Sequence, residues 1–293
     1  MPIACFGEML WDVLPSGPQP GGAPLNVAVH LHQFGLVSQL ISCVGHDDLG
    51  AQLVAFVEGK GLSTHYVQRG ETHPTGVVEA NVGDRNEVVY KIVQPVAWDY
   101  IQYEPALGAL VEATDAFVFG SLAARSPTTR ETLYRLLPAA PFKVFDVNLR
   151  APHYSRDVVT YLLRQANLVK MNHHELTEIM GWFGGSPAEE TALRWLAEHF
   201  QLQAVCVTKG ADGAVLWTGQ QLYHSASPSV TVQDTIGSGD AFLAALLKGW
   251  LADQAPAECL AFACAAGSLV ATYQGATPAV SLPQVEALLA VHQ

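Results

Sequence analysis

The sequence predicts an α/β fold in which a mostly parallel central sheet is flanked by helices. Short β-rich runs alternate with amphipathic stretches along most of the chain, the pattern expected for parallel strands joined by crossover helices. Hydrophobic residues make up 49% of the 293 positions, enough for the core of one large domain or of two modest ones. One segment breaks the alternation and predicts a small β element outside this sheet.

Seven short β-rich runs are the candidate strands of the central sheet. In chain order they are Ile3 to Phe6, Gln39 to Val44, Ala116 to Phe119, Lys143 to Val147, Leu168 to Met171, Ala204 to Thr208 and Ala214 to Trp217. The stretches between them are the candidate helices, including the run Ala241 to Trp250. The segment that breaks the alternation is Thr75 to Gln94, which is strand-like on both sides of Gly83-Asp84-Arg85-Asn86. We interpret it as a hairpin that covers another part of the molecule.

Composition excludes several classes of partner and site. A formal net charge of -12 with only 15 Lys plus Arg argues against nucleic-acid or anionic-membrane binding, because both need clustered positive charge. The five cysteines form no C-x-x-C pair and lie mostly in apolar runs, so we expect reduced core residues. No basic segment of a cleavable signal and no apolar run of membrane-spanning length is present, and we expect a cytoplasmic protein.

A first polar cluster follows the first strand. Glu8 and Asp12 precede Gly21-Gly22-Ala23-Pro24-Leu25-Asn26, which leads into a helical run. Paired glycines let a ligand approach the backbone, while carboxylates and Asn26 are the donors and acceptors that bind sugar hydroxyls. A polar loop that caps a helix is the alternative. No Lys or Arg occurs between Met1 and Gly59, which favours a neutral polyol over a phosphorylated substrate.

Two further clusters follow strands in the middle of the chain. Asp146, Asn148 and Arg150 alternate at the end of one strand, at the sheet edge where ligands bind in open α/β folds. Asn172 and Glu175 follow the next strand. They have the oxygen ligands that suit a hydrated magnesium ion, and equally the spacing of a helix capping box.

The segment Thr208-Lys209-Gly210-Ala211-Asp212-Gly213 also follows a strand. Its glycine turn has the shape that passes under a nucleotide phosphate, and such a sequence also occurs in ordinary turns between strands. The alternatives remain open at this point.

The string Asp234-Thr235-Ile236-Gly237-Ser238-Gly239-Asp240-Ala241-Phe242 predicts an anion site at a helix N-terminus. The amides of Gly237, Ser238 and Gly239 would be unpaired there, and the helix dipole favours a phosphate. A carboxylate in such a place suggests a base that takes a proton from the group attacking the phosphate, so Asp240 is the candidate base. The alternative is a first-turn acid that complements the dipole. The spacing matches neither the Walker nor the dinucleotide-binding motif.

These motifs together resemble those of the phosphofructokinase-B or ribokinase-like carbohydrate kinases over nearly the whole chain. Gly21 to Ala28 through Gly45-His46-Asp47-Asp48-Leu49-Gly50 is similar to the N-terminal signature, and Asp234 to Phe242 to the C-terminal one. The resemblance implies a single ribokinase-like three-layer domain over residues 1–293. It also implies a small β lid formed by residues 13–20 and 75–98.

The resemblance implies a role for each motif residue. It makes Asp240 the catalytic base, with the anion hole for the γ-phosphoryl at Gly237, Ser238 and Gly239. It implies a sugar site formed by Glu8, Asp12, Gly21, Gly22, Asn26, Arg150 and Asp240, and an ATP site formed by Asn172, Thr208, Gly210, Gly213, Gly237 and Gly239. It further implies that Asn172 and Glu175 contact magnesium through water, and that Asp234 and Gly275 form a potassium site. The chain departs from the potassium pattern at Ala279, where some members have serine. Pairing of lids into a homodimer occurs in some members.

The fructokinase branch is the most similar. Gly7-Glu8-Met9-Leu10 with Asp12, Pro95-Val96-Ala97-Trp98-Asp99 and Asp146-Val147-Asn148-Leu149-Arg150 carry this similarity. It implies phosphorylation of a primary hydroxyl of a ketohexose, with fructose favoured. The alternatives are 2-keto-3-deoxygluconate kinase, a ribose or nucleoside kinase, and a sensor that binds sugar without turnover. The lid has Tyr90-Lys91 at the place where the 2-keto-3-deoxygluconate kinase branch usually resembles Tyr-Tyr-Arg, which favours fructose.

Overall fold

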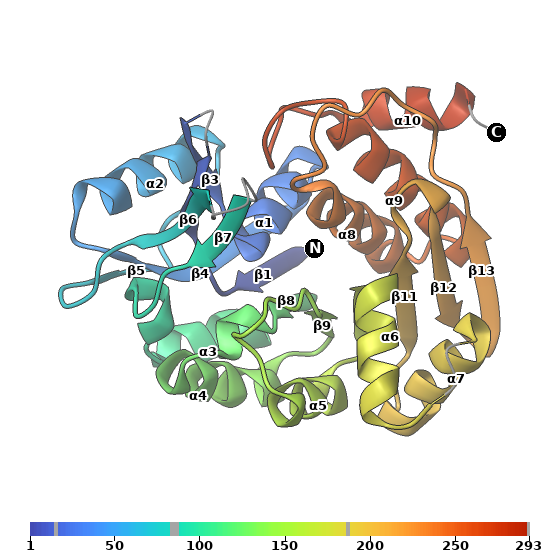
Figure 1. The fold of residues 1–293 in the computed structure, drawn as a ribbon, viewed down its shortest axis with the longest axis horizontal. Coiled ribbons are helices and arrows are strands. Elements are labelled where there is room, and N and C mark those ends of the chain that lie inside the picture. Colours follow the sequence, from blue (N-terminus) through green and yellow to red (C-terminus); the bar gives the residue numbers. More distant parts are fainter. Residues whose placement is uncertain (15–16, 83–87, 186–187, 292–293) are drawn as a thin grey trace.

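A nine-stranded sheet forms the middle of three layers in the computed structural model, which describes residues 1–14, 17–82, 88–185 and 188–291 (Figure 1). The strand order is β13-β12-β11-β10-β9-β8-β1-β4-β5. In chain order the strands are β1 (Pro2–Phe6), β4 (Val37–Gly45), β5 (Val67–Gly70), β8 (Ala116–Gly120), β9 (Lys143–Asp146), β10 (Leu168–Asn172), β11 (Ala204–Thr208), β12 (Ala214–Thr218) and β13 (Gln221–Ser225).

The sheet is parallel from β5 to β11, and β12 pairs antiparallel with both β11 and β13. This confirms the predicted mostly parallel sheet, and all seven predicted strands are present. The strands β5 and β13 were not predicted. Both lie at sheet edges, and Gln221–Ser225 has no fully buried residue, so its sequence lacks the apolar signal of a core strand.

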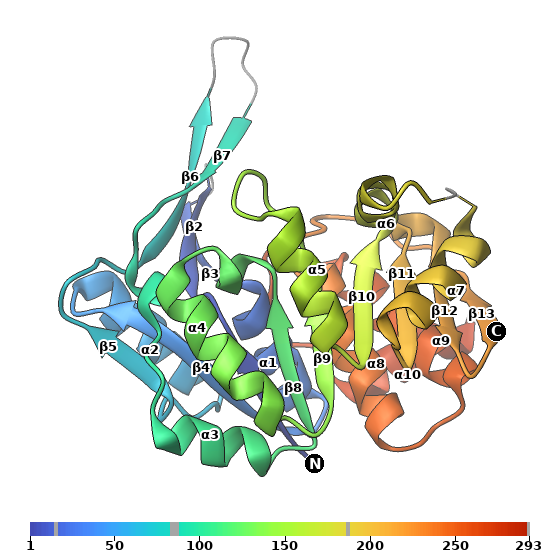
Figure 2. The ribbon, with the colours of Figure 1, turned by 90° about the horizontal axis from the view of Figure 1, so that it is seen from below.

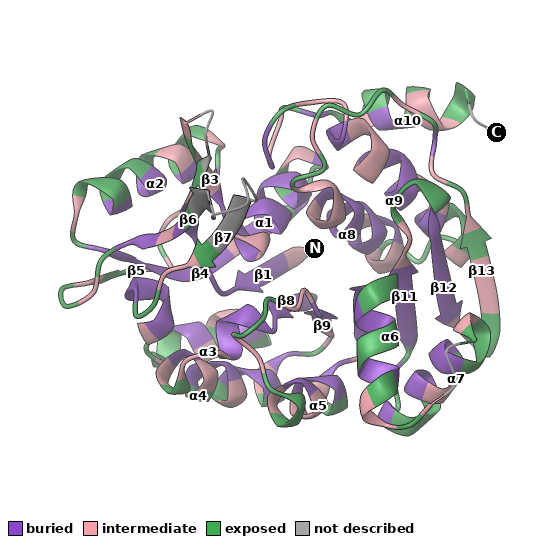
Figure 3. Cartoon of the chain, in the orientation of Figure 1, coloured by how far each residue is buried: buried purple, intermediate pink, exposed green. Residues whose placement is uncertain are grey.

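Helices cover both faces of the sheet because successive strand residues point to opposite sides. In β1, Ile3 and Cys5 enter one core, whereas Ala4 and Phe6 enter the other. The first core packs under α1 (Ala23–Gln33), α2 (Asp48–Gly59), α8 (Ser238–Leu251), α9 (Pro256–Val270) and α10 (Leu282–Val291). The second packs under α3 (Pro105–Glu112), α4 (Pro127–Leu136), α5 (Arg156–Gln165), α6 (His173–Trp182) and α7 (Glu189–Phe200). Figure 3 shows the buried strands between helices whose outer faces are exposed.

A second sheet of four strands stands away from the first. Its order is β3-β2-β6-β7, formed by β2 (Leu10–Leu14), β3 (Gly17–Gly21), β6 (Gly76–Val82) and β7 (Val88–Ile92). Figure 2 shows the β6–β7 hairpin projecting above the main sheet. The strands of the two predicted lid segments, 13–20 and 75–98, therefore lie in one sheet, whereas residues 93–98 lie beyond its last strand. The predicted turn at 83–86 and residues 15–16 fall outside the described residues. No helix within the described ranges is long and apolar enough to cross a membrane.

A buried ion pair fixes the root of this small sheet. Arg125 donates from Nε and Nη2 to the Asp99 carboxylate at 2.7 and 2.8 Å, and both side chains are only 3% exposed. Its Nη2 also donates to the carbonyl of Val93, just beyond β7, at 2.8 Å. The guanidinium lies 3.8 Å from the ring centroid of Trp98, whose indole packs against Gly76 at the start of β6. Both ends of the hairpin therefore meet one buried cluster.

Replacing Arg125 by Met should destabilise the protein by about 3–5 kcal/mol, because Asp99 would keep a buried charge without its partner. Urea unfolding measures the change. The matched control is Lys209→Met, since the pair of Lys209 with Glu189 is partly exposed and should contribute under about 1 kcal/mol. The double variant Arg125→Met with Asp99→Asn should recover part of the loss. An equal effect of Arg125→Met and Lys209→Met would contradict the expectation.

Candidate active site

A cleft of about 1690 Å³ runs along the carboxyl ends of the central strands. Val78 and Ile92 of the small sheet line one end of the cleft, and Cys264 of α9 lines its other half. Most residues predicted for the site line this cleft together: Glu8, Asp12, Gly22, Asn26, Arg150, Asn172, Thr208, Gly210, Gly213, Gly237, Ser238, Gly239 and Asp240.

Four predicted site residues lie outside the lining. Gly21 is in β3, where a β-carbon would collide with the Asp12 carboxylate, so the glycine leaves room for that side chain. Glu175 lies behind the cleft in the first turn of α6. Asp234 and Gly275 contact each other, because the Gly275 amide donates to Asp234 Oδ2 at 3.1 Å. The structure thus places these two side by side, but behind the cleft wall.

Backbone amides at the start of α8 face the cleft. Gly237 has φ +78°, and a β-carbon there would collide with the backbone of Ala276, so only glycine fits without strain. The amides of Gly237 and Gly239 have no acceptor among the described residues. The third predicted amide differs: Ser238 donates to the Thr235 carbonyl at 3.3 Å because the chain makes a tight turn before the helix. The helix terminus therefore offers two free amides to an anion, rather than the three that the sequence predicted.

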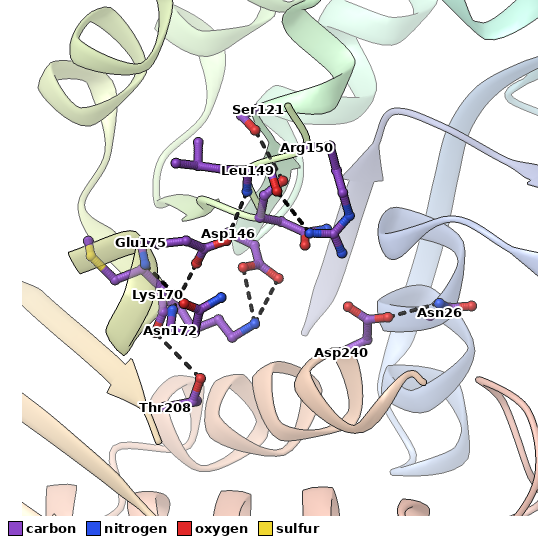
Figure 4. A network of polar contacts seen from close by, with 12 residues as sticks. Asn26, Ser121, Asp146, Leu149, Arg150, Lys170, Asn172, Glu175, Thr208 and Asp240 are labelled. Atoms are coloured by element: carbon purple, nitrogen blue, oxygen red, sulfur yellow. Dashed lines mark hydrogen bonds and ion pairs between the residues drawn. The ribbon is translucent and has the colours of Figure 1, made fainter. Parts of the chain in front are cut away.

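Asp240 joins this terminus to the N-terminal part of the chain. Its Oδ2 accepts from Asn26 Nδ2 at 2.8 Å, across α1 and α8 (Figure 4). Burial raises the Asp240 pKa to about 7, and the nearby Asp146 carboxylate adds to the rise. Lys170, the Asn26 hydrogen bond and Arg150 act in the opposite direction. A carboxyl whose pKa lies near neutral pH is suited to proton transfer at that pH.

A buried lysine, Lys170, lies beside Gly239, and the sequence motifs predicted no role for it. Lys170 Nζ lies 3.1 Å from both carboxylate oxygens of Asp146, its register partner on the adjacent parallel strand. A β-carbon at Gly239 would lie 3.1 Å from the same nitrogen. Burial opposes the charged form, but Asp146 and Asp240 together raise the Lys170 pKa above its ordinary value. The signal available was a lysine inside a predicted core strand.

The end of the cleft near β1 carries acceptors that lack donors. Glu8 Oε1 accepts from the Ala23 amide at 3.2 Å, whereas Glu8 Oε2 and Asn26 Oδ1 have no partner among the described residues. Burial raises the pKa of Glu8, and it raises the pKa of Asp12 to about 6. Buried acceptors without donors are costly, so this end suits a ligand that brings hydroxyl groups.

Asn172 and Glu175 form the capping box of α6, as the sequence allowed. Asn172 Oδ1 accepts from the His174 and Glu175 amides at 2.9 and 3.0 Å, and Glu175 Oε2 accepts from the Asn172 amide at 2.8 Å. Glu175 Oε1 accepts from Leu149 at 2.8 Å, which fixes the loop after β9. Among the described residues no three His, Cys, Asp or Glu side chains could together hold a metal. A carboxylate offers about four lone pairs, so Glu175 still fits the waters of a hydrated magnesium ion.

The turn after β11 lines the same cleft as the helix terminus. Thr208 Oγ1 donates to the Met171 carbonyl at 3.5 Å, and Ser227 Oγ donates to the Gly210 carbonyl at 3.0 Å. These contacts hold the turn between β10 and the segment before α8. The predicted nucleotide residues therefore line the same cleft as the free amides of α8.

Comparisons with known proteins agree with this arrangement. A family model described as pfkB family carbohydrate kinase matches residues 17–283. A fructokinase of Escherichia coli is 29% identical over 266 residues, which cover 83% of this chain and 82% of that protein. An aminoimidazole riboside kinase of Salmonella typhimurium is 28% identical over 288 residues, which cover 93% of this chain and 88% of that protein.

Solved structures support the fold. A fructokinase with bound ATP from Xylella fastidiosa superposes with a TM-score of 0.88 at 24% identity, covering 99% of this chain and 98% of that one. A fructokinase from Vibrio cholerae, with fructose, ADP and potassium bound, gives 0.85 at 23% identity and covers 98% of each chain. At these identities the likeness confirms the predicted ribokinase-like fold alone.

The raised pKa of Asp240 predicts a pH-dependent cost to stability. The folded protein holds this proton more tightly than the unfolded chain, so the contribution of Asp240 becomes less favourable as pH rises from about 4 to about 7. Asp240→Asn should therefore be more stable than wild type by about 2–4 kcal/mol at about pH 8, and by less at about pH 5. Denaturant unfolding at both pH values measures the difference. A pH-independent difference would contradict the raised pKa.

Proposed function

Because this chain belongs to the pfkB family of carbohydrate kinases, we propose that it transfers the γ-phosphoryl group of ATP to a primary hydroxyl of fructose. The observation that carries the proposal is the position of Asp240. Its carboxyl lies at the N-terminus of α8 beside two free amides, and it contacts Asn26 from the opposite wall of the cleft. A hydroxyl placed between the acceptor-rich end and these amides meets a base and an anion site together.

The acceptor-rich end favours a neutral polyol as the phosphoryl acceptor. Glu8 Oε2 and Asn26 Oδ1 need donors, and sugar hydroxyls supply them. Asp12 lines the same end, and its carboxyl would repel an anionic group placed beside it. Fructose brings several hydroxyls and no charge, so it satisfies these acceptors without a further partner.

Proton transfer and charge stabilisation then fall to neighbouring groups. Asp240 accepts the proton of the attacking hydroxyl, and its pKa of about 7 suits this exchange near neutral pH. The amides of Gly237 and Gly239 donate to the moving phosphoryl, while Lys170 places a positive charge next to Gly239. Magnesium, when bound, neutralises charge on the terminal phosphates, and Asn172 with Glu175 would hold it through its waters.

The small sheet acts as the lid in this proposal. Val78 and Ile92 line the cleft, and the root of their hairpin is fixed by the Arg125–Asp99 pair. A lid that pivots above a fixed root can close over the sugar and exclude water, which otherwise competes as the phosphoryl acceptor.

One observation favours an acidic sugar as the second candidate substrate. Arg150 lines the cleft, and its Nη1 donates to the Leu149 carbonyl at 3.0 Å. Among the described residues it forms no ion pair, so its charge is available for a carboxylate such as that of 2-keto-3-deoxygluconate. The Salmonella relative acts on a riboside by its name, which adds ribose and nucleosides to the comparison.

A coupled ADP-release assay with fructose, 2-keto-3-deoxygluconate, ribose and a nucleoside tests the assignment. We expect the highest kcat/KM with fructose, on which the Escherichia coli relative acts by its name. The three neutral substrates should exceed 2-keto-3-deoxygluconate, because their hydroxyls satisfy the unpaired acceptors without adding charge. Arg150→Ala is the informative variant. It should reduce kcat/KM for an acidic sugar by about tenfold or more and affect fructose less. Binding of sugar and ATP without ADP release from any of them would instead indicate a sensor.

Asp240→Asn should retain binding of ATP and sugar while turnover falls by roughly 100-fold or more, the scale of general-base catalysis. In wild type, kcat/KM should fall as pH drops below about 7, because a protonated carboxyl accepts no proton, and it should level off above that pH. A steady-state pH profile with calorimetric binding measures both. Near-normal turnover in Asp240→Asn would show that the base is another group.

A further inference from the structure

The carboxylate of Asp47 joins the start of α2 to the start of β6. Asp47 is the N-cap residue of α2, and its Oδ1 accepts from the Gly50 amide at 2.8 Å. The same oxygen accepts from the Thr75 hydroxyl at 2.6 Å, while Oδ2 accepts from the Thr75 amide at 2.8 Å. Thr75 directly precedes β6 and is buried. A helix cap needs only the first of these contacts, so the other two hold Thr75.

Two glycines leave room for this close approach. Thr75 Oγ1 also accepts from the Gly45 amide at 3.0 Å. A β-carbon at Gly45 would lie 2.6 Å from the Thr75 nitrogen, and one at Gly50 would lie 2.7 Å from Thr75 Oγ1. Burial opposes ionisation of Asp47, but the hydrogen bonds from Thr75 and Gly50 outweigh it and lower the pKa of Asp47. Thr75 is therefore held by a charged carboxylate at neutral pH.

The strand that neighbours β6 in the small sheet is tied to the same helix. β2 pairs in parallel with β6, and Asp12 of β2 lies opposite Val78 of β6. The indole Nε1 of Trp11, also in β2, donates to the carbonyl of Leu49 at 3.0 Å. Leu49 belongs to the first turn of α2. The start of α2 therefore holds β2 through Trp11 and β6 through Thr75.

These contacts bear on the acceptor-rich end of the cleft because β2 carries Asp12. Asp12 lines the cleft, whereas Asp47 and Thr75 do not. Thr75 immediately precedes Gly76, which is the register partner of Leu10, and Leu10 stands two residues before Asp12 on the same strand. A displacement of Thr75 would therefore pass through the strand pairing to the strand that carries Asp12.

We propose that Asp47 and Thr75 are positioning residues for the sugar, because they fix β6 and, through its pairing with β2, the carboxylate of Asp12. The kinetic consequence rests on the proposed phosphoryl transfer to a sugar bound beside Asp12. The turn after β11 and the start of α8 line the other half of the cleft, and the hydrogen bonds of Asp47 and Thr75 do not reach them. Sugar affinity is therefore sensitive to this pair, and MgATP affinity is not.

Thr75→Val removes the hydroxyl with little change of shape. It should raise the KM for the sugar by about tenfold, because two hydrogen bonds that fix the start of β6 are lost, and leave the KM for MgATP within about twofold. Steady-state kinetics with both substrates varied measures the two values. Thr75→Ser keeps the hydroxyl and should behave as wild type.

The matched control is Thr114→Val. Thr114 is also buried, and its hydroxyl donates to the Val111 carbonyl at 2.8 Å. It lies just before β8, at the end of the sheet opposite the cleft, so its loss should leave the KM for the sugar unchanged. Equal KM values for the sugar in Thr75→Val and Thr114→Val would overturn the proposal.

Asp47→Asn is the second variant if Thr75→Val folds poorly. Asparagine is also a favoured N-cap residue, so Oδ1 can still cap α2, but Nδ2 would meet the Thr75 amide donor to donor. The variant should raise the KM for the sugar and spare that for MgATP. An unchanged KM for the sugar in Asp47→Asn would contradict the role of the carboxylate.

A double variant tests whether the effect passes through Asp12. In an Asp12→Ala background, Thr75→Val should change the KM for the sugar by less than about twofold, because the carboxylate that Thr75 positions is gone. Calorimetric sugar binding gives the same comparison where turnover is slow. A further tenfold effect in the Asp12→Ala background would show that Thr75 acts by another route.

Amide hydrogen exchange does not require turnover. Exchange in residues 10–12 and 76–78 should be about tenfold faster in Thr75→Val than in wild type, and unchanged in Thr114→Val. A protein that phosphorylates none of the tested sugars would refute the proposed function and leave this measurement valid. Wild-type exchange in both segments of Thr75→Val would refute the positioning role alone.

Discussion

Asp240 carries a carboxylate into the part of the cleft that attracts anions, and the charges around it set how readily this carboxyl ionises. Two unit charges about 4 Å apart interact by about 4 kcal/mol at an effective dielectric constant of 20, enough to move a pKa by about three units. Burial and Asp146 push the Asp240 pKa upward, while Lys170 and Asn26 push it downward. The result near 7 reflects this balance. Loss of any one of these neighbours would therefore shift the Asp240 pKa.

The parallel sheet explains how these groups come together. The carboxyl ends of β9, β10 and β11 lie at one edge, so the residues that end or follow these strands share the cleft. Lys170 and Asp146 are register partners on adjacent parallel strands and therefore point to the same face. The helix α8 packs against α1, which places Asp240 opposite Asn26 although 214 positions separate them. Local chain geometry supplies each group, and the sheet order supplies their proximity.

The sequence predicts those features that depend on local spacing. The glycines before Asp240, the capping box of Asn172 and Glu175, and the seven core strands each follow from residues within a few positions of one another. Features that depend on register or on packing between distant helices could not be predicted in this way. The Lys170–Asp146 pair requires the strand register, and the Arg125–Asp99 pair requires the fold around the hairpin root. The engaged Ser238 amide depends on one tight turn, which composition does not specify.

The loop behind the start of α8 likewise depends on packing between segments that are distant in the sequence. Gly237 keeps its left-handed conformation only while the Ala276 backbone lies against it, and a loop so placed buries carbonyls that need donors. Side-chain N–H groups meet that need here, because they donate to the carbonyls of the loop. In this chain the donors lie on α1 and just after α2, the elements that also carry Asn26 and cover the first core. The helix that carries Asn26 into the cleft therefore also carries His30 and Gln33, which contact the loop behind Gly237.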